Sequence, residues 1–293
     1  MLIDFRCRPP FSGFVTSTIF KDADFHAVFS QSFGFVQSPS VKACSLDMLI
    51  DELKAAGVDK AVVPARKLYN VTNEDLVDLI NKYPDLFYGM AGIDPEDGDQ
   101  ALAEIDQFVV NGPCVGVTME PGYCANPLKA DDERIFPVYE KCQEHNIPVF
   151  LSHGGLVGPL MEYNDPEIID RVAQIFPNLT IILAHGAYPY VAQACYTCFK
   201  NPNVYLVPDF YATEVPLGNE YLKATSWIPE KIIFGSAYPV QPVDQMLEYY
   251  RTHMSPEAFE MVTYKNAAKI LGIESYTSAL YRSNDQITGK EEL

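Results

Sequence analysis

Eight short runs of apolar residues recur along the chain, and this repeat constrains the fold more than any other feature of the sequence. Each run has the length of a β-strand, and most segments between the runs show the apolar spacing of an amphipathic helix. Strands that alternate with helices form parallel βαβ units. We therefore predict eight parallel strands, at residues 2–5, 60–65, 87–93, 115–119, 148–153, 180–185, 204–209 and 231–237.

Most of these runs are continuously apolar, which is typical of strands that are buried on both faces. Eight such strands suit an α/β fold of the closed (β/α)8 TIM-barrel type. An open doubly wound sheet would need a glycine-rich phosphate turn after its first strand, and residues 6–10, Arg-Cys-Arg-Pro-Pro, cannot form one. The helices expected around the barrel span residues 45–57, 73–84, 99–110, 132–146, 166–177, 188–199, 243–254 and 256–272.

Residues 9–44 interrupt the repeat, because they are too many for an ordinary βα loop. The segment is rich in phenylalanine, at positions 11, 14, 20, 25, 29, 33 and 35. An aromatic insertion at the catalytic face of a barrel can cover the substrate or contact a second subunit, and we expect both, in a homo-oligomer. We predict one barrel domain over residues 1–273, with 9–44 as an insertion or lid, and a loosely ordered C-terminal tail over 274–293.

The net charge of −18 restricts the partners that we expect. Nucleic-acid-binding proteins need basic surfaces, and an acidic chain is repelled by anionic membranes, so we expect neither partner. We recognise no signal peptide and no apolar window long enough to span a membrane. Seven scattered cysteines, an odd number, are typical of reduced thiols in a cytoplasmic protein.

Polar residues follow the apolar runs, and in a TIM barrel the active site forms at the carboxyl ends of the strands. Two of the five histidines end consecutive strands, and each is followed by glycine. Such equivalent positions favour a shared functional role over two independent structural ones. The strand-end candidates are Arg6, Arg8, Arg66, Asp94, Glu120, His153, His185, Asp209 and the pair Ala237-Tyr238.

Five sequence stretches make the chain similar to a known family. They are IDFRCRPP (3–10), LSHGG (151–155), ILAHGA (182–187), IIFGSAYP (232–239) and YKNAAKILGI (264–273). Their order and spacing resemble the amidohydrolase-related family of the amidohydrolase superfamily, in the branch of decarboxylases of the aminocarboxymuconate-semialdehyde type. The resemblance covers essentially the whole chain and implies a barrel enzyme.

The chain departs from this family at the positions that usually bind a metal. Metal-dependent relatives carry a His-x-His pair where this chain has Arg6-Cys7-Arg8, and an aspartate where it has Ala237. Arginine stays protonated and offers no lone pair, so the resemblance identifies a divergent member that lacks the usual ligands. We favour no cofactor. The alternative is a single divalent metal, such as zinc, in a displaced site formed by His153, His185 and Glu120.

The residues themselves indicate binding of a small anionic substrate. A guanidinium group binds a carboxylate through two parallel hydrogen bonds, so Arg6 and Arg8 can hold an anion. Each could instead pair with Asp4, Glu120 or Asp209, and a paired arginine would still have free donors for a ligand. Tyrosine hydroxyls can donate to a developing oxyanion. The predicted substrate-binding residues are Arg6, Arg8, Arg66, Tyr211 and Tyr238.

Acid–base chemistry is expected from four side chains. Histidine titrates near neutral pH and can transfer protons without a metal, and a poorly solvated carboxylate can also serve as a base. The predicted catalytic residues are His153, His185, Asp209 and Glu120.

Three functions remain open from the sequence. The first, which we favour because of the family resemblance, is a hydrolase of a small carboxylate-bearing lactone, ester or amide. The second is a lyase, for example a decarboxylase, or an isomerase of a small organic acid, which needs no activated water; the alanine at position 237 favours this class. The third is a non-catalytic ligand-binding barrel.

Overall fold

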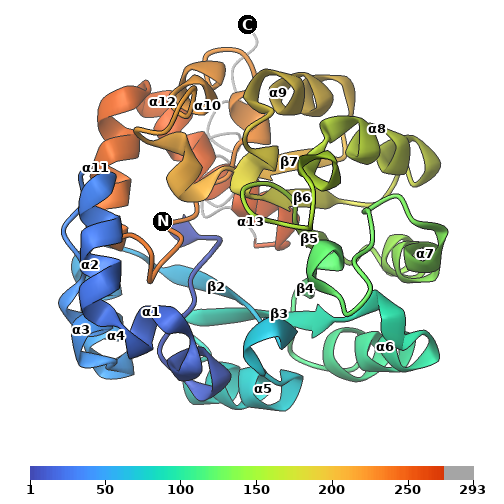
Figure 1. Ribbon diagram of the computed structural model, residues 1–293, viewed down its shortest axis with the longest axis horizontal. Helices are drawn as coiled ribbons and strands as arrows, with labels where there is room; N and C mark the ends of the chain where they lie inside the picture. The colour runs from blue at the N-terminus through green and yellow to red at the C-terminus, as the bar shows by residue number, and fades with distance from the viewer. Residues whose placement is uncertain (274–293) are drawn as a thin grey trace, which may run out of the picture.

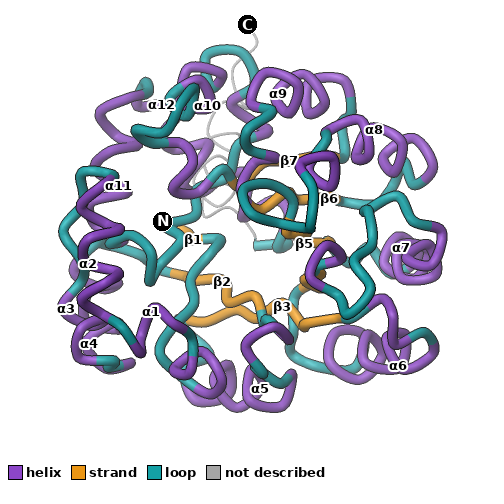
Figure 2. The backbone as a smooth tube through the Cα atoms, viewed as in Figure 1, coloured by secondary structure: helices purple, strands orange, loops and turns teal. Residues whose placement is uncertain are grey.

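A computed structural model describes residues 1–273, and its centre is one sheet of seven parallel strands whose spatial order follows the chain. Figure 2 shows these strands inside a ring of helices. The strands are β1 (Ile3–Asp4), β2 (Lys60–Pro64), β3 (Phe87–Ile93), β4 (Gly116–Met119), β5 (Val149–Ser152), β6 (Ile181–Ala184) and β7 (Val204–Val207). The predicted TIM-barrel fold is confirmed.

Residues 231–237 close the barrel between β7 and β1, but they do not form the regular strand that we predicted. The Ile233 amide donates to the Leu206 carbonyl at 2.8 Å, and the Phe5 amide donates to the Phe234 carbonyl at 3.0 Å. Only one bridge, between Leu206 and Ile232, has strand geometry. The ladder does not continue, because the Phe234 amide donates to the Val262 carbonyl and the Ser236 amide donates to a side chain.

That side chain is the fully buried carboxylate of Asp4. Its Oδ1 accepts from the backbone amides of Arg6, at 3.1 Å, and of Ser236, at 2.9 Å. Its Oδ2 accepts from the Ser236 hydroxyl at 2.6 Å. Burial raises the pKa of Asp4, and the bonds from Ser236 and Arg6 oppose that shift. Asp4 therefore joins the first strand to the closing segment and fixes the backbone that carries Arg6.

The substitution Ser236→Ala should lower the free energy of unfolding by about 1.5–3 kcal/mol, because it removes a buried hydrogen bond to a carboxylate. Chemical denaturation of both proteins measures this difference. Ser32→Ala is the control, because that exposed hydroxyl only bonds the carbonyl of Phe29 in its own helix. Equal losses in the two variants would contradict the role assigned to Asp4.

Helices cover the outside of the barrel (Figure 1). The first helix after the insertion, α4 (Leu46–Ala55), begins where predicted, and the Ser45 hydroxyl accepts from the Met48 amide as its N-cap. The helices after the insertion are α4 (Leu46–Ala55), α5 (Asn73–Lys82), α6 (Asp99–Ile105), α7 (Phe136–Glu144), α8 (Pro166–Ile175), α9 (Val191–Lys200), α10 (Glu220–Ala224), α11 (Val243–His253), α12 (Pro256–Glu260) and α13 (Asn266–Ile270). A π-helical turn at residues 261–265 joins α12 to α13, within the single helix predicted there.

Alternating side chains of the strands enter two separate cores. One face packs against the helices, and the other fills the barrel interior. The interior cluster includes Ile3, Phe5, Val62, Met90, Phe150, Ile182, Tyr205, Val207 and Ile233. If the same alternation is continued past the ends of β2, β3 and β4, the inward positions are those of Arg66, Asp94 and Glu120.

The insertion at residues 9–44 contains the short helices α1 (Thr18–Lys21), α2 (Ala23–Ser32) and α3 (Pro39–Ala43). Phe14 and Phe35 are buried in the helix-facing core. Phe29 and Phe33 of this segment pack edge-on against Phe210, with ring centroids 6.2 and 5.5 Å away. The insertion thus reaches the residue next to Asp209, and its role as a lid or subunit contact stays a prediction.

The tail predicted over residues 274–293 lies outside the described residues. Within residues 1–273, no helix is both long and apolar enough to cross a membrane.

Candidate active site

Arg6, His185 and Asp209 meet at the strand ends, although they are far apart in sequence. The Arg6 guanidinium lies 3.3 Å from His185 Nε2 through Nη2, and 3.3 Å from Asp209 Oδ2 through Nη1. Asp209 Oδ2 also accepts from the His185 backbone amide at 3.1 Å. Asp209 is fully buried and Arg6 nearly so. The structure therefore brings together two predicted catalytic residues and one predicted substrate-binding residue.

These contacts determine the protonation of His185. Arginine can only donate, so Nε2 of His185 is the acceptor and the proton of the neutral ring is on Nδ1. Nδ1 lies 3.1 Å from Asp209 Oδ2, within ion-pair distance but outside hydrogen-bond alignment. Burial lowers the pKa of His185, and Arg6 adds to this effect while Asp209 opposes it. His185 is thus held neutral, with its lone pair toward a cation.

Arg8 is a buried cation without a counterion. Its side chain forms no hydrogen bond or ion pair with any residue of the described part, and its Nε is buried without a partner. Burial, followed by the charges of Arg6 and Arg66, lowers its pKa to about 9. Arg8 still carries its charge at neutral pH. The sequence left open whether either arginine pairs with an acid. In the structure Arg6 pairs with Asp209, whereas Arg8 forms no ion pair with Asp4, Glu120 or Asp209.

Arg66 and Glu120 form a second buried pair beside the first. Arg66 Nε donates to Glu120 Oε1 at 2.6 Å, and Nη2 contacts the same oxygen. The Ser152 hydroxyl donates to that oxygen at 3.2 Å. Burial alone would lower the pKa of Arg66, but Glu120 raises it above its ordinary value. This pair holds Glu120, a predicted catalytic residue, as a carboxylate whose charge is already balanced.

His153 is buried at the end of β5. Within the described residues, its side chain forms no hydrogen bond or ion pair with the Arg6 or the Arg66 group. Its Nε2 has no hydrogen-bond partner among the described residues. Burial lowers its pKa to about 4, and backbone groups of Asp165 and Asn164 oppose the shift. The ring is therefore neutral at physiological pH, and its catalytic role stays a prediction.

The two predicted tyrosines lie in different surroundings. Tyr211 stands edge-on to His185, with centroids 5.5 Å apart, and stacks on Tyr188 at 4.7 Å. Burial raises its pKa, so it remains a hydroxyl donor. Tyr238 is fully buried, and its hydroxyl shares a 2.9 Å hydrogen bond with Ser40 of the insertion. Tyr211 thus borders the arginine cluster formed by Arg6, His185 and Asp209, whereas Tyr238 anchors the insertion.

The substitution Gly155→Ala should displace Tyr211, because a Cβ at this position would overlap the tyrosine hydroxyl. The φ of Gly155 is also +67°, which disfavours alanine. We expect about 2–4 kcal/mol of destabilisation in denaturant unfolding. Gly34→Ala is the matched control: its φ is +80° but no atom lies within 4 Å, so about 1 kcal/mol is expected. Equal losses in the two variants would mean that Tyr211 is not held by Gly155.

A cavity of about 170 Å³ opens at the ends of β2, β3 and β4. Glu120 lines it and connects it to the arginine cluster through Arg66. The lining residues are Ala65, Lys67, Leu68, Gly92, Ile93, Asp94, Thr118, Glu120, Tyr123 and Cys124. Of these, sequence reasoning noted Asp94 without a role and missed Thr118 and Cys124. Thr118 could have been found, because it shares the inward phase of Glu120 in the same strand.

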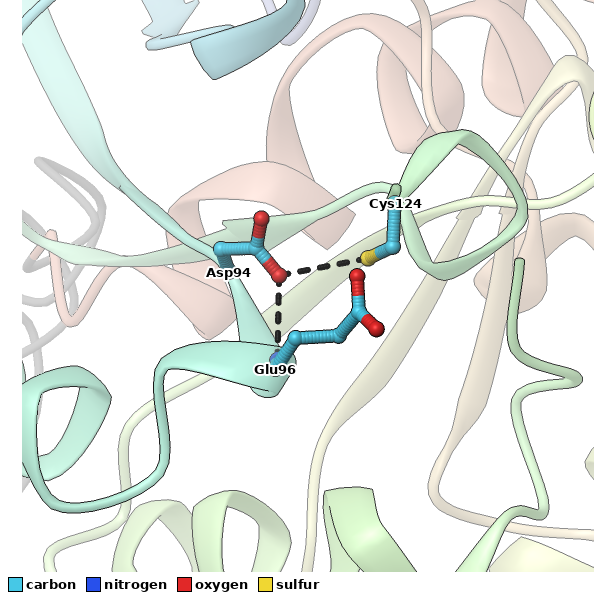
Figure 3. Close-up of side chains that lie close together, drawn as sticks. All are labelled: Asp94, Glu96 and Cys124. Atoms are coloured by element: carbon cyan, nitrogen blue, oxygen red, sulfur yellow. Dashed lines mark hydrogen bonds between the residues drawn. The ribbon is translucent and has the colours of Figure 1, made fainter. Parts of the chain in front are cut away.

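One group of three possible metal ligands lies beside this cavity: Asp94, Glu96 and Cys124, whose ligand atoms lie within 4.8 Å of one another (Figure 3). The Cys124 thiol donates to Asp94 Oδ1 at 3.2 Å. Burial and Asp94 raise the pKa of this thiol. In the described residues this is the only such group, and it differs from the displaced set that we predicted, His153, His185 and Glu120.

The residues at the ends of the first and last strands do not fit a bound metal. The family resemblance places ligands at positions 6, 8 and 237, which hold two guanidinium groups and a methyl group. The Arg6 guanidinium donates to Nε2 of His185, the lone pair that a metal would use. A cation at this point would meet a fixed positive charge and lack three protein ligands.

Comparisons with known proteins agree with this architecture. The sequence model of a family described as "Amidohydrolase" matches residues 22–273. An uncharacterized TIM-barrel protein of Bordetella bronchiseptica is similar along 93% of this chain and 98% of its own, with 33% identity and a TM-score of 0.86. A 5-carboxyvanillate decarboxylase of Novosphingobium aromaticivorans, solved with manganese, has 17% identity and a TM-score of 0.65 over 93% of this chain and 96% of its own.

A curated relative is the 2-amino-3-carboxymuconate-6-semialdehyde decarboxylase of Dictyostelium discoideum. It is 21% identical over 145 residues, which are 43% of this chain. The match spans 40% of the length of that protein.

Proposed function

This chain belongs to the amidohydrolase family, and from that membership we propose that it is a metal-independent lyase of a small organic acid. The observation that carries the proposal is the buried guanidinium of Arg8, which has no counterion among the described residues. A buried charge is stable only when something compensates it. A substrate anion supplies that compensation, and the net charge of the two arginine–acid pairs plus Arg8 is positive.

Unpartnered buried atoms of the predicted site residues support the same proposal. Native proteins leave few buried polar atoms without a hydrogen bond, and water, an ion or a ligand usually accounts for them. Within the described residues, five such atoms belong to predicted site residues: Arg6 Nη1, Arg8 Nε, His153 Nε2, His185 Nδ1 and Asp209 Oδ1. A bound acid would engage several of them at once.

The anion on Arg8 is a group that stays on the product. An arginine that held the departing carboxylate would stabilise the substrate more than the transition state and slow its loss. A guanidinium that binds a retained carboxylate, or the charge that develops in the remaining fragment, lowers the barrier to loss of carbon dioxide. The carbon–carbon bond to the other carboxyl group then breaks, carbon dioxide leaves, and the electron pair of that bond stays on the remaining fragment until its carbon bonds a proton.

His185 is the proposed carrier of the proton that replaces carbon dioxide. Its side chain is 13% exposed and reaches the mouth, whereas His153 is 2% exposed. Nε2 is its only basic atom, so it takes up a proton from water when the Arg6 guanidinium turns from it to the substrate anion, and Asp209 stabilises the positive charge that then forms. Arg6 disfavours the charged form, so the proton is released readily.

The electrostatics of the acids favour a lyase over a hydrolase. Activation of water needs a strong base or a metal. Burial would raise the pKa of Asp209, but Arg6 and His185 outweigh it and hold the pKa low, which makes a weak base. The names of the two decarboxylases above support loss of carbon dioxide, and no comparison supports hydrolysis of a lactone, ester or amide in particular.

Product analysis tests the proposal. The purified protein, treated with EDTA and dialysed, is incubated with pooled small dicarboxylic, keto and hydroxy acids and lactones, and the products are identified by mass spectrometry. We expect loss of carbon dioxide at a rate that EDTA does not change. Products that have only gained water would establish the hydrolase, and carboxylate binding without turnover would establish the binding protein. Homo-oligomer formation and a cytoplasmic location stay predictions.

A further inference from the structure

The cavity at the ends of β2, β3 and β4 is a second polar compartment beside the arginine cluster. Its volume of about 170 Å³ could hold about five water molecules, or one small functional group. Its lining differs in charge from the Arg6 and Arg8 region, because it includes two carboxylates, of Asp94 and Glu120, and a single ammonium group, of Lys67.

The positive charges near this cavity are already neutralised. Lys67 lies 3.0 Å from Asp97 and 2.9 Å from Glu104. Arg66 is neutralised by Glu120. Asp94, in contrast, forms no ion pair with any residue of the described chain. The cavity therefore keeps a net negative charge, which favours a cationic group.

Three of the lining residues each carry a side-chain oxygen that has no protein hydrogen bond within residues 1–273. Thr118 is 4% exposed, lines the cavity and forms no side-chain hydrogen bond within residues 1–273. Oδ2 of Asp94 and Oε2 of Glu120 also accept no hydrogen bond there, since the bonds of these residues go to Oδ1 and Oε1. The Thr118 hydroxyl is not sealed off by the protein and is free to bond a ligand in the cavity. Three acceptors match the three donors of an alkylammonium group.

We propose that this cavity binds the ammonium group of the substrate while Arg8 holds its retained carboxylate. The assignment rests on the proposed function for the carboxylate half. Arg66 joins the two compartments, because it lowers the pKa of Arg8 on one side and bonds the cavity residue Glu120 on the other. The substrate class is then a small acid with an ammonium group at the end remote from its retained carboxylate.

A metal ion fits this place less well than an ammonium group. Cys124 is a protonated thiol that donates to Asp94 (Figure 3). Both oxygens of Glu96 accept from Asn126, and Glu96 is not part of the cavity lining. Of the group Asp94, Glu96 and Cys124, only Asp94 would then be available without breaking existing bonds, which is fewer than the three protein ligands of a zinc site.

Calorimetric titration with matched ligands tests the assignment. The probes are 4-aminobutanoate, 5-aminopentanoate and 6-aminohexanoate, each compared with butanoate, pentanoate or hexanoate. The amino form of the best chain length should bind the parent protein about tenfold more tightly than its alkanoate. Asp94→Asn keeps the shape and the Glu96 amide bond but removes the charge, and Thr118→Val removes only the hydroxyl. Each should reduce the preference toward about twofold.

Glu96→Gln is the control, because it removes a neighbouring charge outside the cavity and should keep the tenfold preference. Equal binding of amino and plain acids by the parent protein would overturn the ammonium subsite and leave the carboxylate site intact. Failure of every probe would overturn the carboxylate site itself. Tight binding of Zn²⁺ or Mn²⁺ that Asp94→Asn abolishes, without a preference for amines, would replace the ammonium with a metal.

Discussion

Arg8→Met should lower kcat/KM by about a hundredfold to a thousandfold while leaving the protein at least as stable as the parent. Both effects have one cause. The guanidinium is 5% exposed and has no counterion in the described structure, so the free protein holds an uncompensated buried charge. Removing one partner of a buried charge pair weakens binding by about 2–5 kcal/mol, whereas removing an unpaired buried charge relieves a desolvation penalty.

The measurements are steady-state kinetics on the product assay and denaturant unfolding on the same samples. Arg134→Met is a matched control, since Arg134 is an exposed arginine paired with Asp132, and neither quantity should change much. A large loss of stability in Arg8→Met, with catalysis unaffected, would show that Arg8 serves the fold and not the substrate.

Asp209→Asn should lower the free energy of unfolding by about 3–5 kcal/mol and abolish turnover. The substitution leaves the buried Arg6 guanidinium without its counterion, and an unpaired buried charge costs about that amount. Asparagine tolerates positive φ as well as aspartate does, so the φ of +47° at this position adds no strain. Turnover fails because nothing then stabilises a proton on His185.

The pH dependence of stability provides a second readout for Asp209. The folded-state pKa of this carboxyl lies below its ordinary value of 3.8. A lowered carboxyl pKa contributes stability that is present above the unfolded pKa and lost as pH falls through the folded pKa. The difference between parent and Asp209→Asn should therefore be constant near neutrality and shrink below about pH 4.

Two further variants separate charge compensation from packing. Asp170→Asn affects a partly exposed pair with Lys200 and should cost about 1 kcal/mol or less. The double variant Arg6→Met/Asp209→Asn removes both charges and should recover most of the lost stability without recovering turnover. If the double variant is as unstable as Asp209→Asn alone, the Arg6 charge is not the source of the loss.

The positions of the site residues followed from local sequence. In the structure, alternation of side chains along β2, β3 and β4 puts Arg66, Asp94 and Glu120 in one inward phase. The strand-end rule for barrels had nominated these three together with Arg6, His185 and Asp209. The first deduction depends on the period of a strand, and the second depends on where each strand ends. The closing segment is the exception, because its ladder ends at a side chain, Asp4, and not at a turn signal.

The pairings between these residues could not be read from the sequence. Arg6 and Arg8 are two residues apart and chemically identical, yet one is bound to His185 and Asp209 and the other is free of counterions in the described structure. Tyr211 and Tyr238 both follow strand ends, but only Tyr211 borders the arginine cluster. These differences depend on which residues the closed fold places beside each side chain.

The sequence by itself determined the barrel, the family and the set of charged groups at its mouth, because strand period, strand length and residue chemistry are local properties of the chain. Only the tertiary structure decided which charges neutralise one another and which remain available. Those pairings depend on distances of about 3 Å between side chains that lie more than a hundred residues apart, as for Arg6 with His185 and Asp209. Coulomb energies and hydrogen bonds at such distances follow from the closed fold and not from the order of residues.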